Sequence, residues 1–265
     1  MIALRSILFQ IAFYGWTFVI LVLYLPLLAM PRRIMQAGTR FWLRGLLFLA
    51  AMICGIRYRI VGRERLPAGP AVIAAKHQSA WDTMIFHQLL DDPVFAVKRE
   101  LFVIPLLGWY MHKAGCIRID RSAPVRAIRT LITGATRALA DGSQVIVFPE
   151  GTRVAPGTHQ PYHAGISGLY GRDEVPVIPV ALNSGVFWGR RAFRKYPGVI
   201  TLEILPPVPA GLDREGFIRE LKQSIETASE RLCAEANQQL PPKWRLAERN
   251  PDADCGMGTE SPGPP

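Results

Sequence analysis

The feature that most limits how this chain can fold is a long uncharged stretch near its N-terminus. Residues 7–30 read ILFQIAFYGWTFVILVLYLPLLAM and contain no charged side chain. About 20 apolar residues suffice to cross a bilayer as a helix. The stretch is longer than the apolar part of a secretory signal peptide, which is roughly 7–15 residues, and no small-residue cleavage site follows it. The sequence therefore predicts an N-terminal helix that attaches to a membrane.

A second apolar stretch, residues 45–56, is too short to cross a bilayer alone and fits a helix in the interface, paired with the first. Trp16, Tyr24 and Trp42 are candidate interfacial anchors. Basic residues gather after the first stretch, at Arg32, Arg33, Arg40 and Arg44, whereas Arg5 alone precedes it. By the positive-inside rule, this bias places the rest of the chain in the cytoplasm, at the inner membrane of the cell. We expect residues 1–57 to form a two-helix membrane-attachment hairpin; one spanning helix plus a surface helix fits equally well.

Composition narrows the classes of partner. The chain has 265 residues, 49% of them hydrophobic, and a formal net charge of +10. Such a charge indicates an anionic partner: nucleic acid, anionic lipid, or an acidic substrate or carrier. No zinc finger or aromatic-studded basic segment is present, so we expect no nucleic-acid binding. The four cysteines are far apart and form no Cys/His cluster, so we expect no metal, no cofactor and no disulfide framework.

From about residue 59 the pattern becomes that of an α/β domain. Short apolar runs bounded by Gly, Pro or charged residues predict strands. They lie at residues 71–75, 94–97, 116–119, 144–148, 175–182 and 200–205. Apolar residues at three- and four-residue steps predict helices over 123–142 and 213–239. We expect a mixed, largely parallel sheet flanked by helices. The domain should span residues 58–245, followed by a disordered Pro/Gly-rich tail at 246–265.

The run VPVIPVAL, residues 175–182, contains two prolines inside an apolar strand. Pro176 and Pro179 cannot donate a backbone hydrogen bond, so the run predicts an edge or bulged strand.

The stretch KHQSAWDT places a histidine five residues before an aspartate, directly after a predicted strand. On a regular helix, His77 and Asp82 would point roughly 140° apart. They can meet if His77 lies in the turn after the strand and Asp82 in the first helical turn, with Ser79 as a good N-cap. An aspartate bound to one imidazole nitrogen leaves the other nitrogen able to take a proton. By itself, the pair favours a structural histidine beside a helix start, with Asp82 as a charge in the first helical turn.

Two further segments follow predicted strands. In FPEGTR, the Gly151 amide, Thr152 and Arg153 are donors suited to a phosphate, and Glu150 either accepts from a hydroxyl or orients Arg153. In GCIRIDR, Arg121 lies at a strand end, and ligands of open α/β sheets gather at strand ends. Alone, FPEGTR also fits an ordinary strand-end turn, and Arg121 also fits an exposed structural arginine.

In these segments the chain resembles the glycerolipid acyltransferases, specifically the 1-acyl-sn-glycerol-3-phosphate acyltransferases. That family carries four ordered blocks, here H-x4-D at 77–82, the Arg121 segment at 115–121, F-P-E-G-T-R at 148–153 and the Pro-containing strand at 175–182. The segment KRELFVIPLLGWYMHKAG before the second block is also similar. One difference is Lys76, where many members have asparagine.

The resemblance implies roles for these residues. His77 would be the general base on the acceptor hydroxyl, and Asp82 its partner. Five residues would hold the glycerol phosphate: Arg121, Glu150, Gly151, Thr152 and Arg153. Lys98 and Arg99 would assist, Pro179 would line the acyl-donor side, and His163 could line the pocket.

The implied reaction is transfer of a fatty acyl group from acyl-CoA or acyl-acyl carrier protein to lysophosphatidic acid, giving phosphatidic acid at the bilayer. The chain has no G-x-S-x-G elbow, so direct attack by the acceptor is favoured over an acyl-enzyme. Alternatives are another lyso-lipid acceptor, such as a lyso-ornithine lipid or lysophospholipid, a thioesterase or lipase, and a lipid-binding protein without turnover.

Overall fold

Seven strands form one sheet in the part of the chain that the computed structural model describes, residues 1–171 and 175–249. The strands are β1 (Ile56–Val61), β2 (Ala71–Ala75), β3 (Pro93–Lys98), β4 (Ile117–Ile119), β5 (Gln144–Val147), β6 (Val177–Leu182) and β7 (Gly198–Ile204). Their order is β1-β7-β6-β2-β5-β3-β4. Only the β6–β7 pairing is antiparallel among those described, so the predicted mixed, largely parallel sheet is confirmed.

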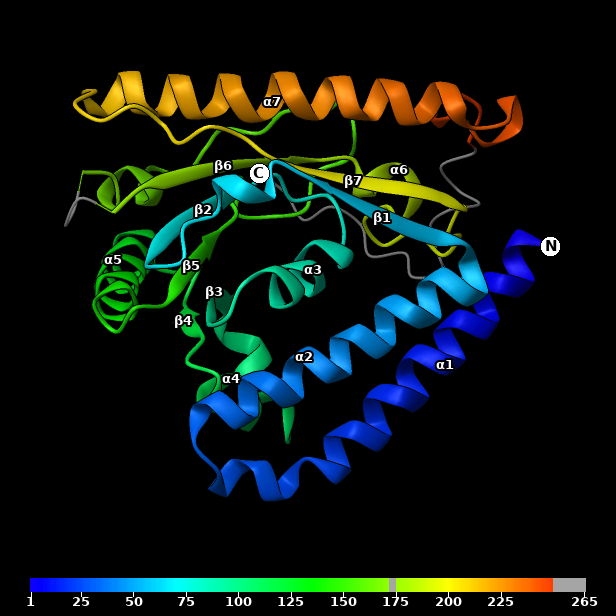
Figure 1. Cartoon of the computed structure of the whole chain (residues 1–265), viewed down its shortest axis with the longest axis horizontal. Coiled ribbons are helices and arrows are strands. Elements are labelled where there is room, and N and C mark those ends of the chain that lie inside the picture. Colours follow the sequence, from blue (N-terminus) through cyan, green and yellow to red (C-terminus); the bar gives the residue numbers. More distant parts are fainter. Residues whose placement is uncertain (172–174, 250–265) are drawn as a thin grey trace.

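Helices cover both faces of this sheet (Figure 1). They are α1 (Ile2–Leu23), α2 (Arg32–Leu49), α3 (Trp81–Leu89), α4 (Leu107–Lys113), α5 (Pro124–Ala140), α6 (Ser184–Phe187) and α7 (Arg214–Gln239). Alternate residues of β2 divide the core between the faces, as a period of two requires. Val72 packs in one cluster with residues of α5 and α7, whereas Ile73 packs in another with residues of α1, α2 and α3.

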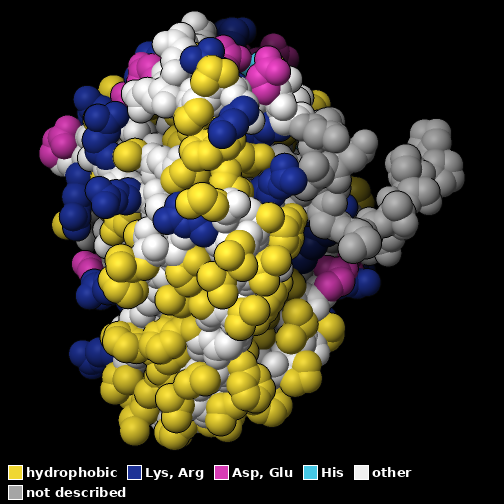
Figure 2. All heavy atoms as spheres, turned by 90° about the vertical axis from the view of Figure 1, so that its right-hand side faces the viewer, with side chains coloured by type: hydrophobic (Ala, Val, Ile, Leu, Met, Phe, Trp, Pro, Cys, Tyr) yellow, Lys and Arg dark blue, Asp and Glu magenta, His cyan; other side chains and the backbone are white. Residues whose placement is uncertain are grey.

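The first two helices form the expected hairpin. Trp16 Nε1 donates to the Trp42 carbonyl oxygen at 3.0 Å, and the Tyr24 hydroxyl donates to the Gly38 carbonyl oxygen at 3.0 Å. Two helical segments, Ile2–Leu23 and Arg32–Cys54, are long and apolar enough to cross a membrane by length and composition. Only 17% of the apolar window of α1 is buried, so most of this helix is not covered by protein. Figure 2 shows hydrophobic side chains gathered over the lower part of the molecule, where Figure 1 places α1.

The second helix is longer than the apolar run of the sequence indicates, because it starts at Arg32 and not near residue 45. Its polar residues bind the sheet domain. Arg32 pairs with Asp92 at 3.0 Å, and Gln36 donates to the same carboxylate at 2.8 Å. Arg40 donates to backbone carbonyl oxygens at the end of α3. These contacts fix the hairpin against α3 and β3.

The prediction of an edge or bulged strand at residues 175–182 is wrong, because β6 lies inside the sheet between β7 and β2. The carbonyl oxygens of Pro176 and Val180 accept hydrogen bonds from Val72 of β2 and from Lys76 directly after it, so the nitrogen of Pro179 faces β7. Pairing with β7 starts only at Val180. Pro179 therefore lies just beyond the antiparallel ladder, where its missing N–H breaks no ladder bond, and its carbonyl oxygen accepts from Leu205.

Two ends of the predicted domain differ in detail from the structure. The strand β1 was not predicted, and the expected boundary between residues 57 and 58 falls inside it. A short helical turn, Leu246–Glu248, lies at the start of the expected tail. Residues 250–265 of that tail lie outside the described part of the chain.

Candidate active site

The structure brings His77 and Asp82 together as the turn-plus-helix argument requires. His77 follows the end of β2, and Asp82 is the second residue of α3, after Ala80 as N-cap in place of the predicted Ser79. Nδ1 of His77 lies 2.9 Å from Oδ2 of Asp82. The same oxygen accepts from the backbone amides of Gln78 at 2.7 Å and Ser79 at 2.8 Å. The carboxylate thus holds the turn and the imidazole at once.

The His77 ring is placed so that one nitrogen stays available. Its ring stacks on Phe148, with centroids 3.9 Å apart and planes 15° apart. The side chain is 12% exposed, whereas Asp82 is fully buried. No hydrogen bond from the described residues reaches Nε2 of His77. The pair therefore presents an oriented imidazole nitrogen to solvent or substrate, the geometry of a general base.

Lys76 lies in a buried cluster of charges behind the histidine. Its Nζ is 2.6 Å from Oε1 of Glu150 and 2.7 Å from Oε2 of Glu226, which comes from α7. The other oxygen of Glu150 accepts from the His77 amide at 3.2 Å. The side chains of Lys76 and Glu150 are 2% and 0% exposed. Buried charges persist only when paired and hydrogen-bonded, so this cluster fixes the backbone that carries His77.

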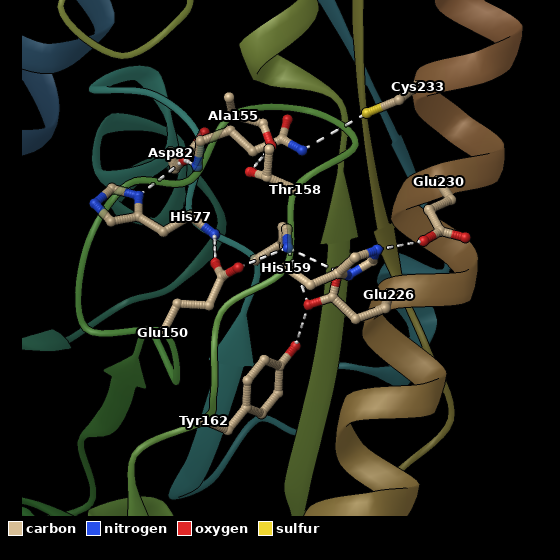
Figure 3. Close-up of polar contacts among 12 residues, drawn as sticks. His77, Asp82, Glu150, Ala155, Thr158, His159, Tyr162, Glu226, Glu230 and Cys233 are labelled. Atoms are coloured by element: carbon tan, nitrogen blue, oxygen red, sulfur yellow. Dashed lines mark hydrogen bonds and ion pairs between the residues drawn. The ribbon is translucent and has the colours of Figure 1, made fainter.

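Further polar groups complete the charge cluster on its α7 side. The Tyr162 hydroxyl donates to Glu226 at 3.0 Å, and His159 bridges Glu226 and Glu230 at 3.1 and 3.0 Å. Figure 3 shows the His77 ring and Asp82 on one side of this cluster and Glu226 with Tyr162 on the other. Burial raises the pKa of the Glu150 carboxyl, which the Lys76 ammonium opposes. Burial, with the nearby Glu226 charge, also raises the pKa of Tyr162 and keeps its hydroxyl a donor.

An open pocket of about 350 Å³ lies against α7, on the Glu226 side of the charge cluster. It is lined by His159, Arg219, Lys222, Gln223 and Glu226. Neither His77 nor Asp82 lines it, so the pocket is separate from the face that the imidazole presents.

The FPEGTR segment folds as a tight turn after β5. Gly151 has φ of 66°, and its amide donates to the Phe148 carbonyl oxygen at 2.9 Å, so that donor is already used. A Cβ at Gly151 would lie 2.6 Å from the ring of His163, which brings His163 against the segment. The Val154 amide donates to the His77 carbonyl oxygen at 2.8 Å, so the segment lies beside the histidine. Both carboxylate oxygens of Glu150 are occupied inside the protein.

Arg153 is the half-buried cation of this segment, and Thr152 is half-buried next to it. Burial lowers the pKa of the Arg153 guanidinium, the charge of Asp82 raises it, and the charges of Arg190 and Arg191 lower it further. The charges of Asp82 in α3 and of Arg190 and Arg191 after α6 therefore act on Arg153 in the loop after β5. Such a surplus of positive charge beside the histidine favours an anion.

The remaining predicted cations follow the neighbouring strands. Lys98 ends β3 and is exposed, and it pairs in register with Ile119 of β4, so Arg121 leaves the sheet close to it. Arg99 forms an ion pair with Asp120. These residues share the carboxyl-end edge of the sheet with His77 and Arg153, as the rule for parallel strands predicts. Pro179, in contrast, is buried in β6, two residues from Val177, which packs with α7 residues.

Two residues with close contacts to the motif were not found from the sequence. Glu226 lies on α7, a helix for which only packing on the sheet was expected. Ser184 donates its hydroxyl to Oδ1 of Asp82 at 2.5 Å. Ser184 could have been found from its place directly after the predicted strand at residues 175–182, since ligand-binding and catalytic residues of α/β sheets lie at strand ends. No local pattern marks Glu226.

Comparison with known proteins identifies the family. A family model described as Acyltransferase matches residues 57–183. A curated 1-acyl-sn-glycerol-3-phosphate acyltransferase from Pseudomonas aeruginosa is 32% identical over 255 residues, which cover 94% of this chain and 96% of the relative. The chain belongs to the family of the 1-acyl-sn-glycerol-3-phosphate acyltransferases. It is an acyltransferase, and the resemblance indicated by the four sequence blocks is confirmed.

Other members of this acyltransferase family agree. The mouse 1-acyl-sn-glycerol-3-phosphate acyltransferase alpha is 33% identical over 205 residues, which cover 76% of this chain and 71% of the relative. The crystal structure of a 1-acyl-sn-glycerophosphate acyltransferase from Thermotoga maritima matches with a TM-score of 0.68 at 24% identity, covering 88% of this chain and 98% of that one. The acyltransferase therefore has the fold of that structure.

Proposed function

We propose that this acyltransferase moves a fatty acyl group from acyl-CoA or acyl-acyl carrier protein to the 2-hydroxyl of 1-acyl-glycerol-3-phosphate, giving phosphatidic acid. The observation that carries the proposal is the His77–Asp82 pair, with its 2.9 Å contact and a ring nitrogen left available. The acceptor follows the names of the relatives at 32% and 33% identity.

In the proposed reaction, the oxygen of the acceptor hydroxyl attacks the carbonyl carbon of the thioester. As it does so, Nε2 of His77 takes the proton of that hydroxyl. The new ester C–O bond forms, the C–S bond breaks, and the thiolate receives the proton from the imidazolium, which restores neutral His77. Asp82 stabilises the imidazolium and holds the ring. Because the acceptor oxygen attacks directly, the step needs no nucleophile from the protein.

The phosphate of the acceptor would bind to the cations around the histidine. Arg153 and Thr152 lie closest along the chain to the Val154–His77 contact, and Arg121 and Lys98 lie at the same sheet edge. Arg99 is paired with Asp120, so we assign it the orientation of the Arg121 loop. Glu150 is buried against Lys76, and Gly151 already donates to Phe148. We assign these two residues to shaping the loop, and Lys76, which is 2% exposed, to holding Glu150.

The donor and the location follow from charge and hydropathy. Acyl-CoA and acyl carrier protein are both acidic, which suits a chain of net charge +10. The exposed apolar side chains of α1 fit a bilayer, and we propose the inner membrane with the sheet domain on its cytoplasmic side. Flotation of the full chain with vesicles, and labelling of a cysteine introduced at exposed Asp141 in sealed spheroplasts, test this placement. Labelling from outside would contradict it.

The deciding assay compares wild type with His77→Ala on acyl-CoA and acyl-acyl carrier protein, using a panel of lyso-lipid acceptors. We expect phosphatidic acid from lysophosphatidic acid and at least a hundredfold loss in the variant. If product forms only with a lyso-ornithine lipid or another lysophospholipid, that lipid is the acceptor and lysophosphatidic acid is not. If the thioester is cleaved equally fast with and without an acceptor, the activity is hydrolysis and not acyl transfer.

A further inference from the structure

The Asp82 carboxylate has one hydrogen-bond donor that belongs to none of the four sequence blocks. Oδ2 accepts from His77 and two backbone amides, whereas Oδ1 accepts from the hydroxyl of Ser184 at 2.5 Å. Asp82 and Ser184 are both 0% exposed. Within the described residues, this hydroxyl is the sole hydrogen-bond donor to Oδ1.

Ser184 is held in place by its neighbours. It is the first residue of α6 and follows β6, the strand beside β2. The next amide, that of Gly185, donates to the side-chain oxygen of Gln78 at 2.9 Å. Two adjacent residues of α6 therefore bind Gln78 in the His77 turn and Asp82 at the start of α3.

We infer that Ser184 is a positioning residue of the proposed reaction, acting on His77 through Asp82. A hydrogen bond to a carboxylate is strengthened by its charge and fixes the plane of the carboxylate. That plane decides whether Oδ2 stays on the imidazole. Without the hydroxyl, Oδ1 would be a buried acceptor with no donor, which costs free energy and favours rotation of the carboxylate. Ser184 itself contacts no reacting atom.

The inference predicts a change in proton affinity besides a change in rate. Loss of the Ser184 hydroxyl lets the Asp82 carboxylate rotate, so Oδ2 no longer stays on Nδ1 of His77. The protonated imidazole is then less well stabilised, and the acidic limb of the pH–rate profile moves to lower pH. The other charged groups near His77 and Asp82 are unchanged between wild type and Ser184→Ala. They are Arg153, Arg190, Arg191 and the Lys76–Glu150 ion pair.

The test compares Ser184→Ala and Ser184→Thr with Ser229→Ala in the full chain in detergent. Ser229 is a matched control, because it is 2% exposed and its hydroxyl has no hydrogen-bond partner among the described residues. We expect Ser184→Ala to lower kcat by about 10-fold to 100-fold with KM for the lyso-lipid nearly unchanged. Ser184→Thr should restore most of the rate, and Ser229→Ala should keep it.

A second measurement tests the inference without any acceptor, and so does not depend on whether the proposed function is right. Histidine NMR titration, with His77→Ala to assign the signal, reports the midpoint of His77 without any substrate. We expect this midpoint to fall in Ser184→Ala and to stay unchanged in Ser229→Ala. An unchanged or raised midpoint in Ser184→Ala, or a kcat within twofold of wild type, would overturn the role of Ser184. A lowered midpoint in a chain that makes no phosphatidic acid would reject the proposed acceptor but keep Ser184.

Discussion

Nζ of Lys76 lies 2.6 Å from Oε1 of Glu150, although the two residues are 74 positions apart in the chain. Glu226, 150 positions from Lys76, supplies a second carboxylate to the same ammonium group. Lys76 is thus a counter-ion that joins the loop after β2, the FPEGTR segment and α7. The Lys76 side chain is buried, with 2% of its surface exposed, and its ammonium group is bound by carboxylates of the protein itself.

The first prediction concerns this charge cluster. Lys76→Met should lower the free energy of unfolding by about 3–5 kcal/mol, because it leaves two buried carboxylates without a cation. Glu226→Gln in the same chain should recover part of the loss, with a coupling of about 1–3 kcal/mol. Denaturant unfolding in detergent measures all four corners of the cycle. The exposed pair Arg231–Glu235 of α7 is the control, with an expected coupling of at most about 0.5 kcal/mol. Additive effects at Lys76 and Glu226 would contradict the prediction.

The second prediction concerns the partner of the histidine. Asp82→Asn should lower kcat by about 10²–10⁴-fold, because an amide cannot stabilise the imidazolium as a carboxylate does. The KM for the lyso-lipid should change little, since Asp82 is buried and acts in the proposed reaction only through His77. Steady-state kinetics on vesicles measures both constants. Asp141→Asn, at the exposed end of α5, should behave as wild type. An Asp82→Asn variant with more than a tenth of the wild-type kcat would be inconsistent with a general-base pair.

The third prediction concerns the turn at Gly151. Gly151→Ala adds a Cβ where φ is 66° and the His163 ring would be 2.6 Å away, so the loop and Arg153 must move. We expect the activity to fall by about 10-fold to 100-fold. Gly142→Ala is the control, because it has a similar positive φ of 85° but open space around the added atom. It should cost only the backbone strain, about 1–2 kcal/mol, and keep the specific activity. Gly151→Ala with His163→Ala should recover part of the activity; no recovery would refute the steric explanation.

The fourth prediction is a pH effect on stability at His87 of α3. Burial lowers the pKa of His87 from 6.5 to about 4, with the Arg40 charge acting in the same direction. The unfolded chain therefore binds a proton below pH 6.5 that the folded chain refuses until about pH 4. The free energy of unfolding is therefore highest above pH 6.5, as far as this group is concerned, and falls by about 3 kcal/mol toward pH 4. Thermal unfolding midpoints measured at several pH values from 4 to 6.5 should show this fall in wild type. His112→Gln, a substitution at an exposed histidine, is the control and should show the same fall. The same slope in His87→Gln would argue against this residue.

Much of the fold and part of the site could be predicted from local patterns. Apolar runs bounded by Gly, Pro and charges located six of the seven strands, and the His77–Asp82 contact followed from a turn between a strand and a helix. Strand order could not be predicted, because it depends on pairing between distant segments. The run at residues 175–182 was expected to be an edge or bulged strand because of its two prolines, but Pro179 lies just beyond the ladder with β7, so β6 can lie inside the sheet. The Lys76–Glu226 pair could not be predicted for the same reason, because it joins two residues that are 150 positions apart in the chain. On the sequence, Glu226 is one more charge on an amphipathic helix, and its burial is set by how α7 crosses β6.

The shared core described above bears on how the protein can be produced. Phe9, Leu43, Leu46, Leu47, Ala50 and Cys54 of the hairpin pack in one cluster with Ile73, Trp81, Phe86 and Phe187 of the sheet domain. A shortened chain that begins after residue 57 would lose β1's first residues and expose these apolar side chains to water, in the region of α3 that carries Asp82. Truncation would then give an aggregating fragment and not a soluble enzyme. Solubilisation must keep the hairpin and cover it with detergent or a lipid disc.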